Sequence, residues 1–82
     1  MFVYILSWDD YEAHEVFGIF SSLEKAIDAC PVKDNTKCIG RKYNPDKKGW
    51  DHVSKDTPDT GLWQFENTDY NIEKYEIDKN LR

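Results

Sequence analysis

Cysteine, proline and glycine are scarce in this 82-residue chain, which also has no long apolar run. Its two cysteines, Cys30 and Cys38, are too few for a disulfide framework, so we expect thiols in a reducing compartment. No stretch approaches the roughly 18 apolar residues that a membrane-spanning helix needs. The first ten residues, MFVYILSWDD, have no basic region and no small-residue cleavage site, unlike a signal peptide. We therefore expect a mature chain that begins at Met1 and stays in the cytoplasm.

Basic residues are also in the minority. The chain has 11 Lys and Arg against 16 Asp and Glu, which gives a net charge of −5 and a pI of about 4.8. This balance argues against general binding of nucleic-acid phosphates and permits docking on a basic partner. The charge is uneven: residues 31–61 carry seven basic and five acidic side chains, whereas residues 1–30 carry one basic and six acidic.

Aromatic side chains, by contrast, are plentiful at 15% of the residues. Each buried aromatic ring removes about 150–250 Å² from water, so a few of them can build the core of a small domain. We expect one soluble domain over residues 1–82.

Four segments have the β-branched and aromatic content of strands: residues 2–6, 15–20, 62–67 and 70–78. The first two are expected to pair antiparallel across a polar connection, SWDDYEAHE, and Gly18 indicates a bulge or a close approach by another side chain. Residues 31–61 hold most of the glycine and proline and are expected to form an irregular, loop-rich insert. Within this insert, KCIGRKY is compatible with one short strand.

Residues 22–30 have helical spacing, with apolar side chains at i, i+3, i+4 and i+7. The sequence SSLE fits a capping box that joins Ser21 at the N-cap to Glu24, and Pro31 ends the helix. The prediction is an α+β fold: a small antiparallel sheet of about four to five strands with one helix packed on one face, in the order ββα, insert, ββ.

Three stretches, VYIL, GIFSSLEKA and IEKYEIDK, resemble a family of short, uncharacterised bacterial and phage proteins. The resemblance covers about a third of the chain, at its two ends, and its motifs determine the fold. It implies this architecture and a phage or prophage origin, with no established activity and no catalytic residue.

The candidate binding residues are aromatic and acidic side chains in the expected loops. Trp and Tyr are the side chains that most often anchor protein interfaces. We predict a non-catalytic protein-binding module, in its sharper form a phage-encoded inhibitor of a host enzyme or defence complex. The predicted interface consists of Trp8, Asp9, Asp10, Tyr11 and Glu12 in the first loop, with Tyr43 and Trp50 in the insert.

Two alternatives remain open at this point. The stretch GRKYNPDKKGW combines basic and aromatic side chains, as a surface for single-stranded nucleic acid does; its candidate residues are Arg41, Lys42, Tyr43, Lys47, Lys48 and Trp50. The other alternative is a small enzyme or metal protein. The cluster DDYEAHE matches no calcium loop, and the four Cys and His residues lack the short spacing of structural zinc ligands. We therefore expect no cofactor, no metal and no catalysis.

Overall fold

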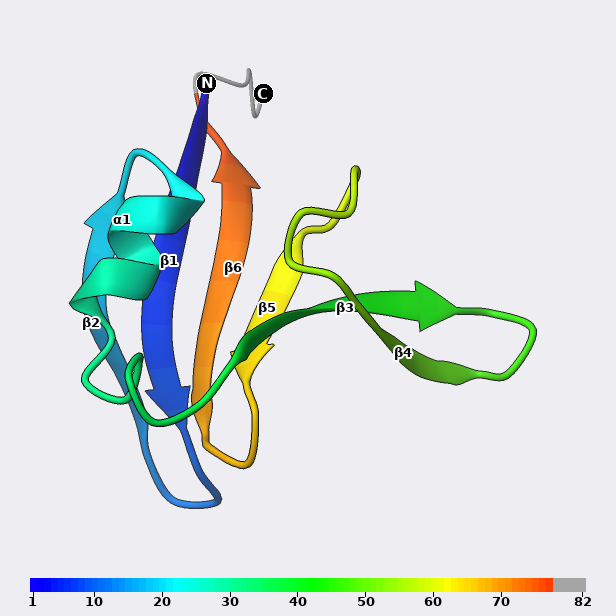
Figure 1. Ribbon diagram of the computed structural model, residues 1–82, viewed down its shortest axis with the longest axis horizontal. Helices are drawn as coiled ribbons and strands as arrows, with labels where there is room; N and C mark the ends of the chain where they lie inside the picture. Colours follow the sequence, from blue (N-terminus) through cyan, green and yellow to red (C-terminus); the bar gives the residue numbers. More distant parts are fainter. Residues whose placement is uncertain (78–82) are drawn as a thin grey trace.

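The computed structural model describes residues 1–77 as a six-stranded antiparallel sheet with one short helix (Figure 1). Its elements are β1 (Phe2–Asp9), β2 (His14–Phe20), α1 (Leu23–Ala29), β3 (Cys38–Asn44), β4 (Gly49–Val53), β5 (Leu62–Phe65) and β6 (Tyr70–Glu76). The strands lie side by side in the order β2-β1-β6-β5-β3-β4. An antiparallel sheet with one helix is therefore present as predicted, but the predicted four to five strands are too few. The end of the expected last strand, residue 78, lies outside the described residues.

Two of the six strands come from residues 31–61: β3 corresponds to the short strand expected at KCIGRKY, whereas β4 lies where the prediction had only irregular chain. β3 and β4 form a hairpin in which Asn44 pairs with Gly49. The turn between them has the expected chemistry: the Asn44 side chain accepts a hydrogen bond from the backbone N–H of Asp46, and Lys48 has a φ of 54°. β4, with the sequence GWDHV, has too little apolar alternation to be recognised as a strand.

The first hairpin is longer than its sequence predicts. β1 and β2 extend as far as Asp9 and His14, so the connection is only residues 10–13. The Asp10 carboxylate accepts hydrogen bonds from the backbone N–H groups of Glu12 and Ala13, both at 2.8 Å, and thereby holds this tight turn. The bulge expected near Gly18 is also present, because the register between the two strands shifts next to it.

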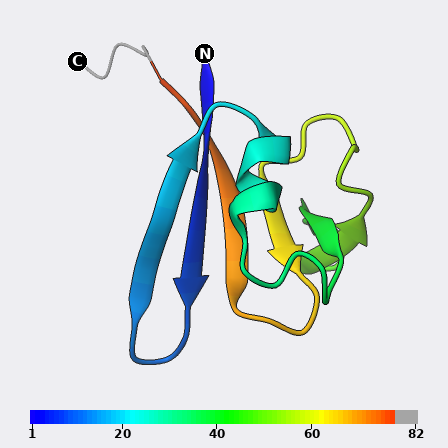
Figure 2. The same cartoon turned by 60° about the vertical axis from the view of Figure 1, so that its left-hand side comes forward.

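The helix begins one residue later than predicted. Ser22 is the N-cap, and its hydroxyl accepts the backbone N–H of Lys25 at 3.2 Å. The predicted cap, Ser21, instead contacts the Lys25 ammonium, so the expected capping box with Glu24 does not form. α1 packs on β1 and β2 on one face of the sheet (Figure 2). Within residues 1–77 no helix is long and apolar enough to cross a membrane.

Cross-strand pairing arranges the sheet in lateral rows. One row, on the helix side, runs from β4 to β2 through Val53, Gly40, Trp63, Ile72, Leu6 and Gly18. Its large central members form the core with Phe65, Ala26 and Cys30. The next row points to the opposite face, because side chains alternate along each strand. It contains His52, Arg41, Leu62, Glu73, Ile5 and Ile19.

Candidate functional site

The hairpin of β3 and β4, residues 38–53, projects from the rest of the sheet and is called the hairpin arm below (Figure 1). Tyr43 and Trp50 lie directly opposite each other on it, edge to face, with ring centroids 5.4 Å apart. Each is about half exposed, at 50% and 48%. The guanidinium carbon of Arg41 lies 5.4 Å from the centre of the Trp50 ring. Strand alternation places these three side chains, the arm cluster, on the sheet face opposite the helix.

A hollow of about 450 Å³ lies beside the arm cluster. It is lined by residues 41–43 of β3, Trp50 of β4, and Asp59, Gly61, Leu62 and Glu73 from the body of the sheet. Register explains this assembly: Arg41 pairs with Leu62, and Leu62 pairs with Glu73. Four strands, β3 to β6, thus line one hollow, the arm pocket.

The lysines of the arm do not join the arm cluster. Lys42 pairs with Asp51 across the hairpin, one position out of phase with Arg41 and Tyr43. The Lys47 ammonium lies 2.9 Å from the Asp51 carboxylate, which also accepts a hydrogen bond from the Asn44 amide at 3.1 Å. These two hydrogen bonds, chiefly that from Lys47, lower the pKa of Asp51. The six residues predicted for nucleic-acid binding are therefore divided between two faces and a turn.

The acidic part of the predicted interface lies elsewhere, in the tight turn between β1 and β2 (Figure 1). Trp8 is half-buried in β1 and pairs with Glu15 and Tyr70, so it is a strand residue and not the loop residue that was expected. Tyr11 and Glu12 are exposed in the turn. The predicted interface therefore consists of two separate surfaces, the turn and the hairpin arm.

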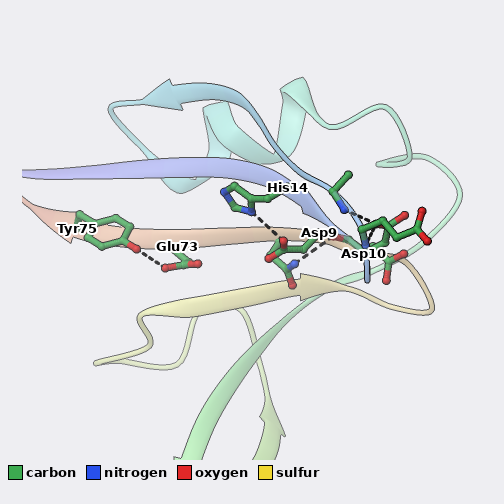
Figure 3. Close-up of polar contacts among 9 residues, drawn as sticks. Asp9, Asp10, His14, Glu73 and Tyr75 are labelled. Atoms are coloured by element: carbon green, nitrogen blue, oxygen red, sulfur yellow. Dashed lines mark hydrogen bonds and ion pairs between the residues drawn. The ribbon is translucent and has the colours of Figure 1, made fainter.

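The two aspartates of this turn already have partners within the chain. Asp10 holds the backbone of the turn, and the Asp9 carboxylate lies 2.8 Å from Nδ1 of His14 (Figure 3). With Tyr11 and Asp69 they line a hollow of about 370 Å³. Three carboxylates line this hollow, and two of them already accept hydrogen bonds within the chain. It therefore has fewer free polar groups and less apolar surface for a partner protein than the arm pocket has.

A polar pair lies near the arm pocket on the same face of the sheet. The Tyr75 hydroxyl donates a hydrogen bond to the Glu73 carboxylate (Figure 3). This hydrogen bond and the negative charge of Glu73 raise the pKa of Tyr75. Part of the hydrogen-bonding capacity of Glu73 is therefore already used within the sheet.

The two cysteines show no sign of catalytic activation. Both are free thiols, and Cys30 is 2% exposed in the core. Burial raises the pKa of Cys30 and raises that of Cys38 to about 11. Since the thiolate is the nucleophile, such thiols react slowly near neutral pH. Among residues 1–77, no group of three or more His, Cys, Asp or Glu side chains is arranged to hold a metal ion.

Sequence reasoning identified Tyr43, Trp50 and Arg41 but missed Asp59, Leu62 and Glu73 of the arm pocket. The alternation in LWQF predicted a strand, but only the register reveals which neighbours Leu62 has. Comparison with protein-family models gave no match, and searches of curated proteins and of solved structures gave no significant match.

Proposed function

We propose that this chain is a protein-binding module without catalytic activity, and that its hairpin arm is the main contact surface. The observation that carries the proposal is the arm cluster itself. Arg, Tyr and Trp are enriched among the residues that dominate binding energy at protein interfaces, and here one of each shares an exposed face beside a hollow. The turn residues Trp8, Asp9, Asp10, Tyr11 and Glu12 are a secondary surface in this proposal.

The arrangement favours a protein partner over single-stranded nucleic acid. Base stacking needs exposed aromatic rings, which Tyr43 and Trp50 supply, but it also needs a positively charged groove. Arg41 is the one basic side chain in the arm cluster, while Asp59 and Glu73 line the adjoining pocket. With Lys42 counted, the lining has two basic and two acidic residues, so it has no net positive charge to attract a chain of phosphates.

The resemblance to short phage proteins adds a more specific form of the proposal, in which the partner is a host enzyme or defence complex that the module inhibits. The small size and the net charge of −5 are compatible with this role. Its support is the resemblance alone, so the identity of the partner has to come from experiment.

The test is affinity capture of tagged protein from a bacterial lysate at moderate salt, with three chains in parallel: wild type, Trp50→Ala and Tyr11→Ala. We expect one stoichiometric protein with wild type and with Tyr11→Ala, and its loss with Trp50→Ala, because a central aromatic anchor is worth about 2 kcal/mol or more. Circular dichroism of each variant controls for folding.

Three results would contradict the proposal: no specific protein with wild type, equal capture by wild type and Trp50→Ala, or recovery only of nucleic acid that nuclease removes. Loss with Tyr11→Ala alone would move the contact surface to the turn between β1 and β2.

A further inference from the structure

The Arg41 side chain has hydrogen-bond donors that no acceptor among residues 1–77 uses. Its Nε is buried and has no acceptor among the described residues. Within residues 1–77 the ion pairs are formed by other side chains, so the charge of Arg41 also has no carboxylate within 4.0 Å. A buried donor without a partner is costly, and native structures usually satisfy such groups.

The surroundings of Arg41 limit what can satisfy it. The arm pocket has apolar walls from Tyr43, Trp50 and Leu62, and Arg41 and Lys42 are the basic residues of its lining. Asp59 and Glu73 also line the pocket, and Glu73 is engaged by the Tyr75 hydroxyl. A ligand with one negative charge and an adjacent apolar group matches this lining, whereas a ligand with several negative charges meets two carboxylates.

We propose that the arm pocket binds an acidic side chain of a partner peptide, with its carboxylate on Arg41 and a neighbouring apolar side chain against Trp50 and Leu62. This inference rests on the proposed protein-binding function and specifies the chemistry of the partner. A guanidinium presents parallel N–H donors that match the two oxygens of a carboxylate. The cation–π contact of Arg41 with the Trp50 ring, at 5.4 Å, restricts this side chain before a ligand binds, so less side-chain freedom is lost on binding.

The proposal differs from what the net charge alone suggests. An acidic protein is expected to dock on basic partners, but the hairpin arm carries Arg41, Lys42, Lys47 and Lys48 against Asp46 and Asp51, an excess of two positive charges. The hairpin arm therefore has a net charge of opposite sign to that of the whole chain, while the two basic and two acidic residues that line the arm pocket balance.

The test is an NMR titration of ¹⁵N-labelled full-length protein with two capped peptides, Ac-Gly-Leu-Asp-Phe-Gly-NH₂ and its Asn analogue. The Nε–Hε signal of Arg41 and the indole signal of Trp50 report binding at the pocket. We expect the Asp peptide to bind at least about tenfold more tightly than the Asn peptide, because a hydrogen bond to a charged group is worth about a factor of ten or more.

Two variants with the same change of charge localise the effect. Arg41→Gln should reduce the affinity for the Asp peptide to that for the Asn peptide. Lys48→Gln is the matched control, since this residue lies in the turn of the same arm and does not line the pocket. It should leave both affinities within about twofold, as expected for an exposed charge far from the contact.

The inference is overturned if the Asp peptide produces no shift of Arg41 at millimolar concentration, or if Lys48→Gln weakens its binding as much as Arg41→Gln. Tighter binding of a ten-nucleotide deoxythymidine strand than of the Asp peptide would assign the arm to nucleic acid. If both peptides bind equally and shift the Trp50 signal, the pocket does not recognise the carboxylate, but the proposed protein-binding function still stands.

Discussion

The N-terminal ββα unit, residues 1–30, and the hairpin arm, residues 38–53, divide the tasks of this small protein between them. The ββα unit supplies Leu6, Ala26 and Cys30 to the buried core, whereas no large side chain of the arm is fully buried. Both regions expose large apolar side chains, Tyr43 and Trp50 on the arm and Tyr11, Phe17 and Ile19 among others on the ββα unit, but the arm carries net positive charge and the ββα unit five net negative charges. The fully buried side chains and the proposed contact surface thus lie in different parts of the same sheet.

This division has a physical reason. A chain of this length buries only roughly 60% of the surface of its unfolded form, so it has few apolar residues to spare. The helix packs on β1 and β2, and the buried core lies on the same face of the sheet as the helix. The strands farthest from the helix, β3 and β4, keep one exposed face, and β4 is an edge strand. There, Tyr43 and Trp50 remain available to another molecule.

The largest expected difference is in stability. Ile72→Ala removes a fully buried side chain at the centre of the core row and should lower the free energy of unfolding by about 2–5 kcal/mol. Trp50→Ala, half exposed on the arm, should cost about 1 kcal/mol, mainly through its lost edge contact with Tyr43. Urea denaturation followed by circular dichroism measures both. Equal losses would show that the arm belongs to the core.

The junction between the two regions can be tested through Cys38, the first residue of β3. Burial raises its pKa to about 11, so the native state favours the neutral thiol. In a Cys30→Ala background at pH 8, iodoacetamide should label native Cys38 roughly 100-fold more slowly than the unfolded chain, since only the thiolate reacts.

The pH dependence of this group has a definite sign. Because the folded-state pKa of Cys38 lies above the ordinary thiol value of about 9.0, its contribution to stability is complete below pH 9 and decreases as the pH rises toward 11. Similar labelling rates in the native and unfolded chains would show that Cys38 is exposed to solvent and that the start of β3 does not pack against the core.

The helix cap tests the ββα unit alone. Ser22→Ala removes the acceptor of the Lys25 backbone N–H and should destabilise the protein by about 1 kcal/mol. The matched variant Ser21→Ala should cost less, because the Ser21 hydroxyl only contacts an exposed ammonium. Thermal unfolding distinguishes the two variants. A larger effect of Ser21→Ala would instead support the capping box that the sequence predicted.

The smallest effect concerns the arm alone. Hydrogen bonds from Lys47 and Asn44 lower the pKa of Asp51, so their support of the turn is present above the ordinary Asp pKa of about 3.9 and is lost as the pH falls through the lower folded-state value. NMR signals of Tyr43 and Trp50 should change with a midpoint below that value, while those of α1 do not follow. The change should be absent in Asp51→Asn; a midpoint above the ordinary value would contradict the proposed pairing.

The sequence predicted the structure of the ββα unit better than that of the hairpin arm. The ββα unit was recognisable because its strands are rich in β-branched and aromatic residues and its helix has an apolar stripe ending before Pro31. β4 was missed because GWDHV is short and polar, and it becomes a strand only by pairing with β3. The candidate site was half predicted: Arg41, Tyr43 and Trp50 lie within ten positions in sequence, whereas Glu73 does not.

The sequence by itself determined the local properties: an antiparallel sheet with one helix, a core that includes aromatic rings, two isolated thiols, and an uneven distribution of charge. These follow from periodicity and composition, which act over a few neighbouring residues. Only the tertiary structure decided that Arg41 would lie beside Leu62 and Glu73, and that the acidic turn and the aromatic arm would be separate surfaces. Register is set by which side chains of each strand are buried and by the pairing of the strands across the sheet, and a shift of one residue would turn Arg41 to the other face.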